Sequence, residues 1–225
     1  MGLTYAQSIL RSHIVTPNDL MVLCRTEEKS LQLSQQHSGR FLSNPDQCVR
    51  EADLLILAVK PQDSTELFSQ IKPFLQQGQV FLSIMAGVRM TTIGAALGVD
   101  KIIRAMPNLP AQIGAGVTAF TSTDPVTRIE LVTVQNLLNT TGKTLYVERE
   151  EMIDAATAIS GSGPAYVFYF MNAMMEAARE MGFSQSESEL LVSQTFTGAV
   201  DLYNKSDLSC DAWIGRVARD RKSVV

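Results

Sequence analysis

Hydrophobic and polar positions follow two different patterns in this 225-residue chain. Up to about residue 149, short apolar or β-branched runs alternate with stretches whose apolar residues recur at helical spacing. The short runs predict strands at residues 20–24, 53–59, 80–85, 101–106, 116–121 and 144–148. Residues 54–59, LLILAV, contain no polar position, which is typical of a strand buried on both faces. Strands that alternate with helices predict an α/β fold with a mainly parallel sheet covered on both faces.

The helical stretches change in character along the chain. Residues 64–75 and 125–139 predict helices between strands, and Pro125 is expected in the first turn of the second, after an Asp124 cap. After residue 149 the strand pattern disappears, and three helices are predicted at residues 150–159, 162–181 and 184–204. Gly182 is placed to end one of them, and Ser184 to cap the next. This change predicts two domains, at residues 1–149 and 150–225.

The predicted helix at residues 162–181 is apolar on nearly all sides over its first half. A helix with this pattern is normally buried. A small helical domain offers too little surface to bury it alone, so we expect a second copy of the chain to cover it. The pattern therefore predicts a homodimer formed through the helical domain.

Composition and charge exclude several classes of function. The net charge of −4 gives no basic face for a nucleic acid. The apolar runs are far too short to cross a bilayer, and no signal-peptide pattern is present, so a cytoplasmic location is expected. Cys24, Cys48 and Cys210 form no CxxC pair and are predicted to be free thiols, mostly buried. His13 and His37 are isolated in the sequence, so neither a metal site nor histidine acid–base catalysis is predicted.

Candidate binding residues follow the predicted strands, where open α/β sheets hold their ligands. Arg25 after the first strand suits the 2′-phosphate of NADP, although a solvated loop arginine is an equal alternative. Small residues follow the next strands in AVKPQ, residues 58–62, and MAGV, residues 85–88. The two prolines of RAMPNLP, residues 104–110, stiffen a loop around an asparagine. Gly2 alone carries little information, because a small residue after an initiator methionine is common.

The most specific motif is ISGSGPAY at residues 159–166. Exposed backbone N–H groups and two hydroxyls at the start of a helix can bind a small anion such as a carboxylate. A tight turn between two helices would use the same glycines, and the residues alone do not decide between these alternatives.

In order and spacing, AVKPQ, SIMAG, RAMPNLP and ISGSGPAYVF resemble the pyrroline-5-carboxylate reductases, and the resemblance extends to about Ala218. It implies a Rossmann-like NADP-binding domain followed by an all-α domain that forms a homodimer, with larger rings of dimers in some members. The reaction implied is the last step of proline biosynthesis, reduction of 1-pyrroline-5-carboxylate to L-proline, with NADPH as cofactor and NADH as the second option. The cofactor-binding residues implied are Gly2, Arg25, Thr26, Asn44, Ala58, Val59, Lys60, Pro61, Ala86, Gly87 and Asn108. The substrate-binding residues implied are Glu150, Thr157, Ala158, Ser160, Gly161, Ser162 and Gly163.

The sequence departs from the family pattern in three places. Leu109 stands where the family usually has threonine. We expect two parts of the family pattern to be missing. One is the first strand with two glycines of the phosphate-binding turn. The other is a C-terminal SPGGTT-like loop, which RDRK at residues 219–222 replaces. That loop carries the family's catalytic threonine, so no catalytic residue is predicted.

Two alternatives to an active pyrroline-5-carboxylate reductase remain open. A β-hydroxyacid-type dehydrogenase has the same architecture but uses a helical lysine as its acid, and no lysine lies between Lys143 and Lys205. A catalytically inactive remnant that only dimerises or binds the cofactor is the other alternative.

Overall fold

A computed structural model describes the backbone of residues 1–220 and the side chains of residues 1–218. The basic C-terminal segment predicted to replace a family loop, residues 219–222, therefore lies outside the described side chains. The chain divides into two compact units, Met1–Pro164 and the residues from Ala165 onward, here called the sheet unit and the helical unit. The domain division predicted between residues 149 and 150 stays a prediction.

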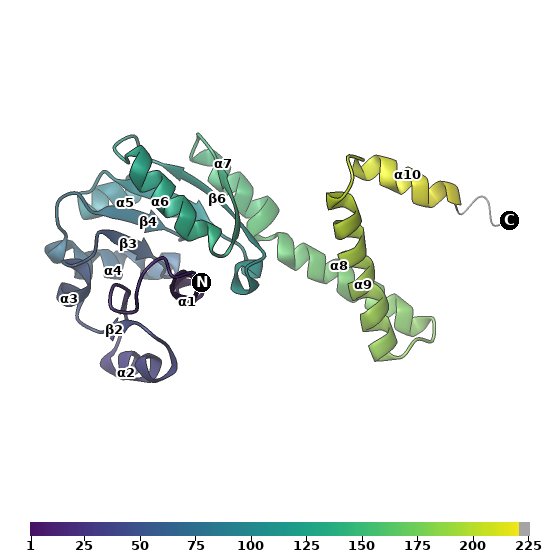
Figure 1. The fold of residues 1–225 in the computed structure, drawn as a ribbon, viewed down its shortest axis with the longest axis horizontal. Helices are drawn as coiled ribbons and strands as arrows, with labels where there is room; N and C mark the ends of the chain where they lie inside the picture. The colour runs from purple at the N-terminus through teal and green to yellow at the C-terminus, as the bar shows by residue number, and fades with distance from the viewer. Residues whose placement is uncertain (221–225) are drawn as a thin grey trace. The chain divides into compact units, whose positions relative to one another are not determined.

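The sheet unit contains a two-stranded and a five-stranded sheet (Figure 1). All pairings are parallel except that of β5 with β6, which confirms the predicted mainly parallel α/β fold. In the smaller sheet β1 pairs with β2, and the larger sheet has the order β3-β4-β5-β6-β7. The strands span Met21–Leu23 (β1), Arg40–Leu42 (β2), Leu54–Leu57 (β3), Val80–Ser83 (β4), Ile102–Met106 (β5), Gly116–Ser122 (β6) and Gly142–Tyr146 (β7).

Alternate residues of β4 enter two separate hydrophobic cores, because successive side chains of a strand point to opposite faces. Phe81 packs with apolar residues of α4 and α5, whereas Leu82 packs with residues of α1 and α6. The larger sheet is therefore covered on both faces, as expected. The helices of this unit are α1 (Gly2–Arg11), α2 (Glu27–Gln36), α3 (Pro45–Val49), α4 (Ser64–Ile71), α5 (Met90–Leu97), α6 (Arg128–Asn139) and α7 (Glu151–Ala156), and its 3₁₀ turns are η1 (Pro61–Asp63), η2 (Lys72–Phe74) and η3 (Leu109–Ile113).

Helix α6 begins later than predicted. The expected cap at Asp124 with Pro125 in the first turn is wrong, because the helix starts at Arg128 after a Thr127 cap. Thr127 and Glu130 form a reciprocal capping box, which satisfies two backbone N–H groups at the helix start.

The chain passes from α7 into α8 (Gly163–Glu180) without leaving a helical path. One π-helical turn, Thr157–Gly161, joins the two helices, where the sequence left open an anion-binding helix start or a tight interhelical turn. The Ser162 N–H donates to the Thr157 carbonyl, five residues earlier, at 2.8 Å, which gives this turn a wider hydrogen-bonded loop than an α-helical turn has. Such π turns are rare and occur frequently at functional sites.

The helical unit consists of the rest of α8, α9 (Gln185–Asn204) and α10 (Cys210–Asp220). The predicted cap of α9 is confirmed, since Ser184 and Glu187 form a capping box. The predicted glycine between α8 and α9 is confirmed as well, because Gly182 has a φ of 101°. The first half of α8 is largely uncovered within the chain, and Tyr169 is 77% exposed. No helix within residues 1–220 is both long enough and apolar enough to span a membrane.

Candidate functional site

The cofactor residues predicted from the sequence follow the carboxyl ends of five strands. Each of β1 to β5 contributes one short segment to these loops. Open parallel sheets bind ligands at this edge, where helix N-termini and loops converge. The segments are Arg25 and Thr26 after β1, Asn44 after β2, Ala58, Val59, Lys60 and Pro61 after β3, Ala86 and Gly87 after β4, and Asn108 after β5.

Two contacts bring these segments together across the edge. A Cβ atom built on Gly2, the first residue of α1, would lie 3.1 Å from the Cβ of Ala58, so the helix start is packed closely against the end of β3. An ion pair joins the Arg25 guanidinium to the Asp63 carboxylate at 3.2 Å. The loops after β1 and β3 and the start of α1 therefore share one edge of the sheet unit.

Part of this edge remains open to a ligand. No side chain caps the N-terminus of α1, so its first backbone N–H groups have no such acceptor. Gly87 has a φ of 72°, and a Cβ built there would meet no atom within 4 Å. Thr26 and Asn44 instead cap α2 and α3, accepting from the N–H groups of Lys29 and Asp46. Small residues, the backbone N–H groups at the start of α1 and the exposed guanidinium of Arg25 fit a nucleotide with a phosphate chain.

The predicted substrate residues begin beside a buried arginine. Arg104 of β5 is 1% exposed, and its guanidinium donates to Glu150 at 3.0 Å and to Asp154 of α7 at 2.6 Å. Glu150 also accepts from the Met90 N–H at 2.7 Å. Within the described side chains, the Arg104 Nε has no hydrogen-bond partner. The network fixes the start of α7 against β5 and engages the Glu150 carboxylate.

The π turn lies against the end of the same strand. A Cβ built on Gly161 would be 2.8 Å from the Cε of Met106, the last residue of β5. The Thr157 hydroxyl donates to the Ile153 carbonyl at 2.9 Å, which leaves the hydroxyl oxygen able to accept a hydrogen bond. The Ser160 hydroxyl donates to Ala156 at 2.9 Å, while Ala158, Ser162 and Gly163 complete the turn and the start of α8.

Asn108 lies two residues beyond Met106, in the loop that leaves β5. Its side-chain oxygen accepts from the Val117 N–H at 3.0 Å, which fixes the loop to β6. The loop of Asn108, a predicted cofactor-binding residue, and the predicted substrate turn therefore both attach to the carboxyl end of β5.

Several residues of this arrangement were not in the predicted site, namely Asp63, Met90, Arg104 and Met106. Arg104 carried a usable signal, because it is the only charged residue in the apolar strand IIRAM. A charge inside a buried strand requires a partner. The partners are 46 and 50 residues away in sequence, so the pattern could not identify them.

None of the cysteines or histidines belongs to the predicted site. Cys24 and Cys48 are buried free thiols, as predicted, while Cys210 is exposed. Burial raises the pKa of the Cys48 thiol to about 11 and also raises that of Cys24. His37 lies 2.9 Å from the Gln7 side chain. Among the described residues no group of three metal-ligating side chains is present.

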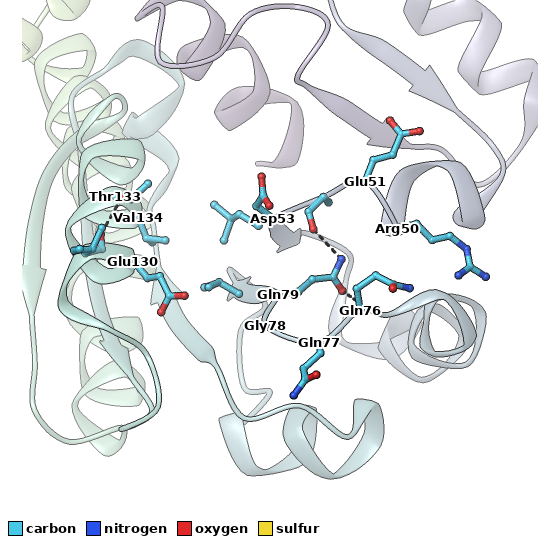
Figure 2. Close-up of a pocket in the computed structure, with 14 residues that line it drawn as sticks. Arg50, Glu51, Asp53, Gln76, Gln77, Gly78, Gln79, Glu130, Thr133 and Val134 are labelled. Atoms are coloured by element: carbon cyan, nitrogen blue, oxygen red, sulfur yellow. Dashed lines mark hydrogen bonds between the residues drawn. The ribbon is translucent and has the colours of Figure 1, made fainter.

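A cleft of about 400 Å³ lies at the opposite, amino edge of β3 and β4 (Figure 2). Its polar lining includes Glu51, Asp53, Gln79 and Glu130. Gln79 is buried and fully engaged: its amide donates to the carbonyls of Val49 and Ala52, and its oxygen accepts from the Gln76 N–H. The cleft is separate from the predicted site, and the buried Gln79 amide already has hydrogen-bond partners within the protein.

Two protein-family models match parts of the chain. Residues 150–220 match the family model for pyrroline-5-carboxylate reductase dimerisation, and residues 1–87 match the model for coenzyme F420-dependent NADP oxidoreductases. The dimerisation match supports a homodimer.

Individual relatives extend over most of the chain. Pyrroline-5-carboxylate reductase 2 of Bacillus subtilis is 34% identical over 200 residues, which cover 88% of this chain and 71% of that protein. A Coxiella burnetii pyrroline-5-carboxylate reductase has a TM-score of 0.85 at 27% identity, covering all of this chain and 81% of the other. The Plasmodium falciparum pyrroline carboxylate reductase, solved with NADP bound, has a TM-score of 0.83 at 26% identity, covering all of this chain and 87% of the other. The chain belongs to the pyrroline-5-carboxylate reductase family.

Proposed function

We propose that this chain reduces 1-pyrroline-5-carboxylate to L-proline, with NADPH supplying the hydride. The observation that carries the proposal is the double attachment at β5. The carboxyl ends of β1 to β5, with the start of α1, form an edge that is here called the nucleotide edge. Strand β5 ends in the Asn108 loop of this edge, and its last residue, Met106, contacts Gly161 of the π turn. A substrate bound at that turn would lie beside the nucleotide edge. Hydride transfer requires such proximity.

The nucleotide edge suits a phosphorylated dinucleotide from end to end. Backbone N–H groups at the start of α1, beside Gly2, would hold the pyrophosphate. Arg25 and Thr26, with Asn44, would face the adenosine ribose and its 2′-phosphate. The small residues after β3 and β4, together with Asn108, would let the backbone approach the nicotinamide half.

The π turn suits the substrate carboxylate. The first turn of α8 would offer the backbone N–H groups of Gly163 and Ala165 to a carboxylate, since Pro164 has none, and the hydroxyls of Ser160 and Ser162 would add further polar contacts. Glu150, held by Arg104 and the Met90 N–H, would border the substrate without being free to move. A protonated imine is already electrophilic, so these residues need only orient it and exclude water.

The uncovered face of α8 supports a dimer formed through the helical unit. Tyr169 and Phe170 are 77% and 65% exposed, and apolar surface of this extent is rarely left in water. We propose that a second copy covers this face, and that the assembly is cytoplasmic. Sedimentation of the purified chain would distinguish a dimer from the larger rings that the resemblance implies.

A turnover assay with two matched variants tests the proposal. Purified chain is mixed with NADPH and pyrroline-5-carboxylate, and the absorbance of the reduced nicotinamide is followed. Asn108→Ala and Asn139→Ala each remove one side-chain hydrogen bond of about equal length, at 3.0 and 2.9 Å. Only Asn108→Ala should lower turnover, because Asn139 lies at the end of α6.

The remaining alternatives are distinct outcomes of that assay. NADPH binding without oxidation would indicate a cofactor-binding remnant and contradict the proposal. Oxidation of a β-hydroxyacid with NADP, but no reaction with the imine, would favour the dehydrogenase alternative.

A further inference from the structure

The ion pair between Arg25 and Asp63 occupies the position proposed for the adenosine ribose. Arg25 follows β1, and Asp63 ends η1 after β3. Their side chains are 67% and 33% exposed, so the pair lies at the surface of the nucleotide edge. The guanidinium that would bind a 2′-phosphate is therefore already bound to a carboxylate of the same protein.

We infer that Asp63 is a specificity-determining residue that weakens the preference of this site for a 2′-phosphorylated nucleotide. The inference rests on the proposed function. A guanidinium binds carboxylates and phosphates with the same planar fork, so the two anions compete for Arg25. A nucleotide with a free 2′-hydroxyl meets no such competition, because a hydroxyl can donate to the Asp63 carboxylate.

Within the described side chains, the charged residues that neighbour Arg25 and Asp63 in the sequence form no ion pair with either of them. Glu27 and Glu28 occupy the first turn of α2, immediately after the Thr26 cap. The Lys29 ammonium donates to Gln32 at 2.8 Å, on the same helix. Lys60, on the exposed loop after β3, makes no ion pair within the described side chains. Among the described side chains, Asp63 is the one carboxylate that pairs with Arg25, so its removal should shift nucleotide affinity measurably.

A binding titration of the whole chain without substrate tests this inference. The dissociation constants of NADPH and NADH are measured for wild type and Asp63→Asn. We expect Asp63→Asn to bind NADPH about fivefold more tightly, since it removes one exposed ion pair and one repulsion. Binding of NADH should stay equal or weaken. The Asp63 side chain makes no capping hydrogen bond to α4, so asparagine should preserve the local fold.

Two further variants separate this effect from a general change of charge. Glu51→Gln also removes one carboxylate from an ion pair, with Arg40 at 2.8 Å, but at the amino edge shown in Figure 2. It should leave the ratio of the two constants unchanged. In an Arg25→Ala background, Asp63→Asn should no longer strengthen NADPH binding.

The outcomes are distinguishable. An unchanged ratio of the two dissociation constants in Asp63→Asn would overturn the inference, as would an equal shift in Glu51→Gln. If the wild-type chain bound neither nucleotide, the proposed function itself would fail, and the inference with it.

Discussion

Replacing Arg104 with methionine tests whether the buried ion network holds the substrate turn in place. The side chain is 1% exposed, while its partners Glu150 and Asp154 are 17% and 46% exposed. The bond to Glu150 is therefore largely shielded from water, and the bond to Asp154 is half exposed. Methionine keeps most of the aliphatic volume but removes the charge and both hydrogen bonds.

The expected cost follows from these exposures. A shielded hydrogen bond to a charged group contributes about 1.5–3 kcal/mol. The half-exposed pair adds about 0.2–1 kcal/mol. Methionine also removes the unpaired Arg104 Nε, and relief of a buried unsatisfied donor returns about 1 kcal/mol. We therefore expect Arg104→Met to lower the free energy of unfolding by about 2 kcal/mol, and Asp154→Asn by only about 0.5 kcal/mol.

Urea unfolding followed by far-ultraviolet circular dichroism measures both variants. Trp213 is the single tryptophan of the chain and lies in the helical unit, so its fluorescence reports separately on that unit. Glu150→Gln should fall between the two variants, because glutamine can still accept from the Met90 N–H. If Arg104→Met unfolded at the same urea concentration as Asp154→Asn, the network would not contribute as argued.

Four further predictions concern other parts of the chain. The raised pKa of Cys48 means that its stabilising effect is present below pH 9.0 and lost as pH rises towards about 11, so the unfolding midpoint should fall across that range. In the native protein, Cys210 alone should react quickly with a thiol reagent, as counted by absorbance. Ser184→Ala should destabilise α9 by about 1 kcal/mol in thermal unfolding, through loss of its capping box. Gly161→Ala should lower turnover more than stability, because the new Cβ displaces only the flexible end of Met106.

The sequence predicted the elements whose signal is local. Buried strands such as Val80–Ser83 and the Ser184 cap of α9 were recognisable because apolar runs and capping residues act over a few positions. Strand β2, Arg40–Leu42, was missed because its two apolar residues lie between polar ones, whereas the equally short β1 lies in the apolar run LMVLC. The start of α6 was misplaced because Pro125 and the Thr127–Glu130 capping box are both good start signals, and reciprocal hydrogen bonds favoured the later one.

The sequence predicted which residues belong to the candidate site better than it predicted how they are arranged. Motif order was enough to place Arg25, Ala58 and Asn108 at the ends of three different strands, β1, β3 and β5. It could not show that Arg25 is paired with Asp63, because the two residues meet only when β1 and β3 are placed at one edge. The π turn was likewise hidden, since serines and glycines are equally typical of a tight turn.

Transfer of a labelled hydride from NADPH would test directly whether this chain reduces pyrroline-5-carboxylate. The purified chain is incubated with pyrroline-5-carboxylate and NADPH carrying deuterium at both C4 positions of the nicotinamide, and the products are analysed by mass spectrometry. We expect proline with one deuterium, located at C5. If no deuterated proline formed and the deuterated NADPH stayed unconsumed at high protein concentration, the proposed reaction would be contradicted.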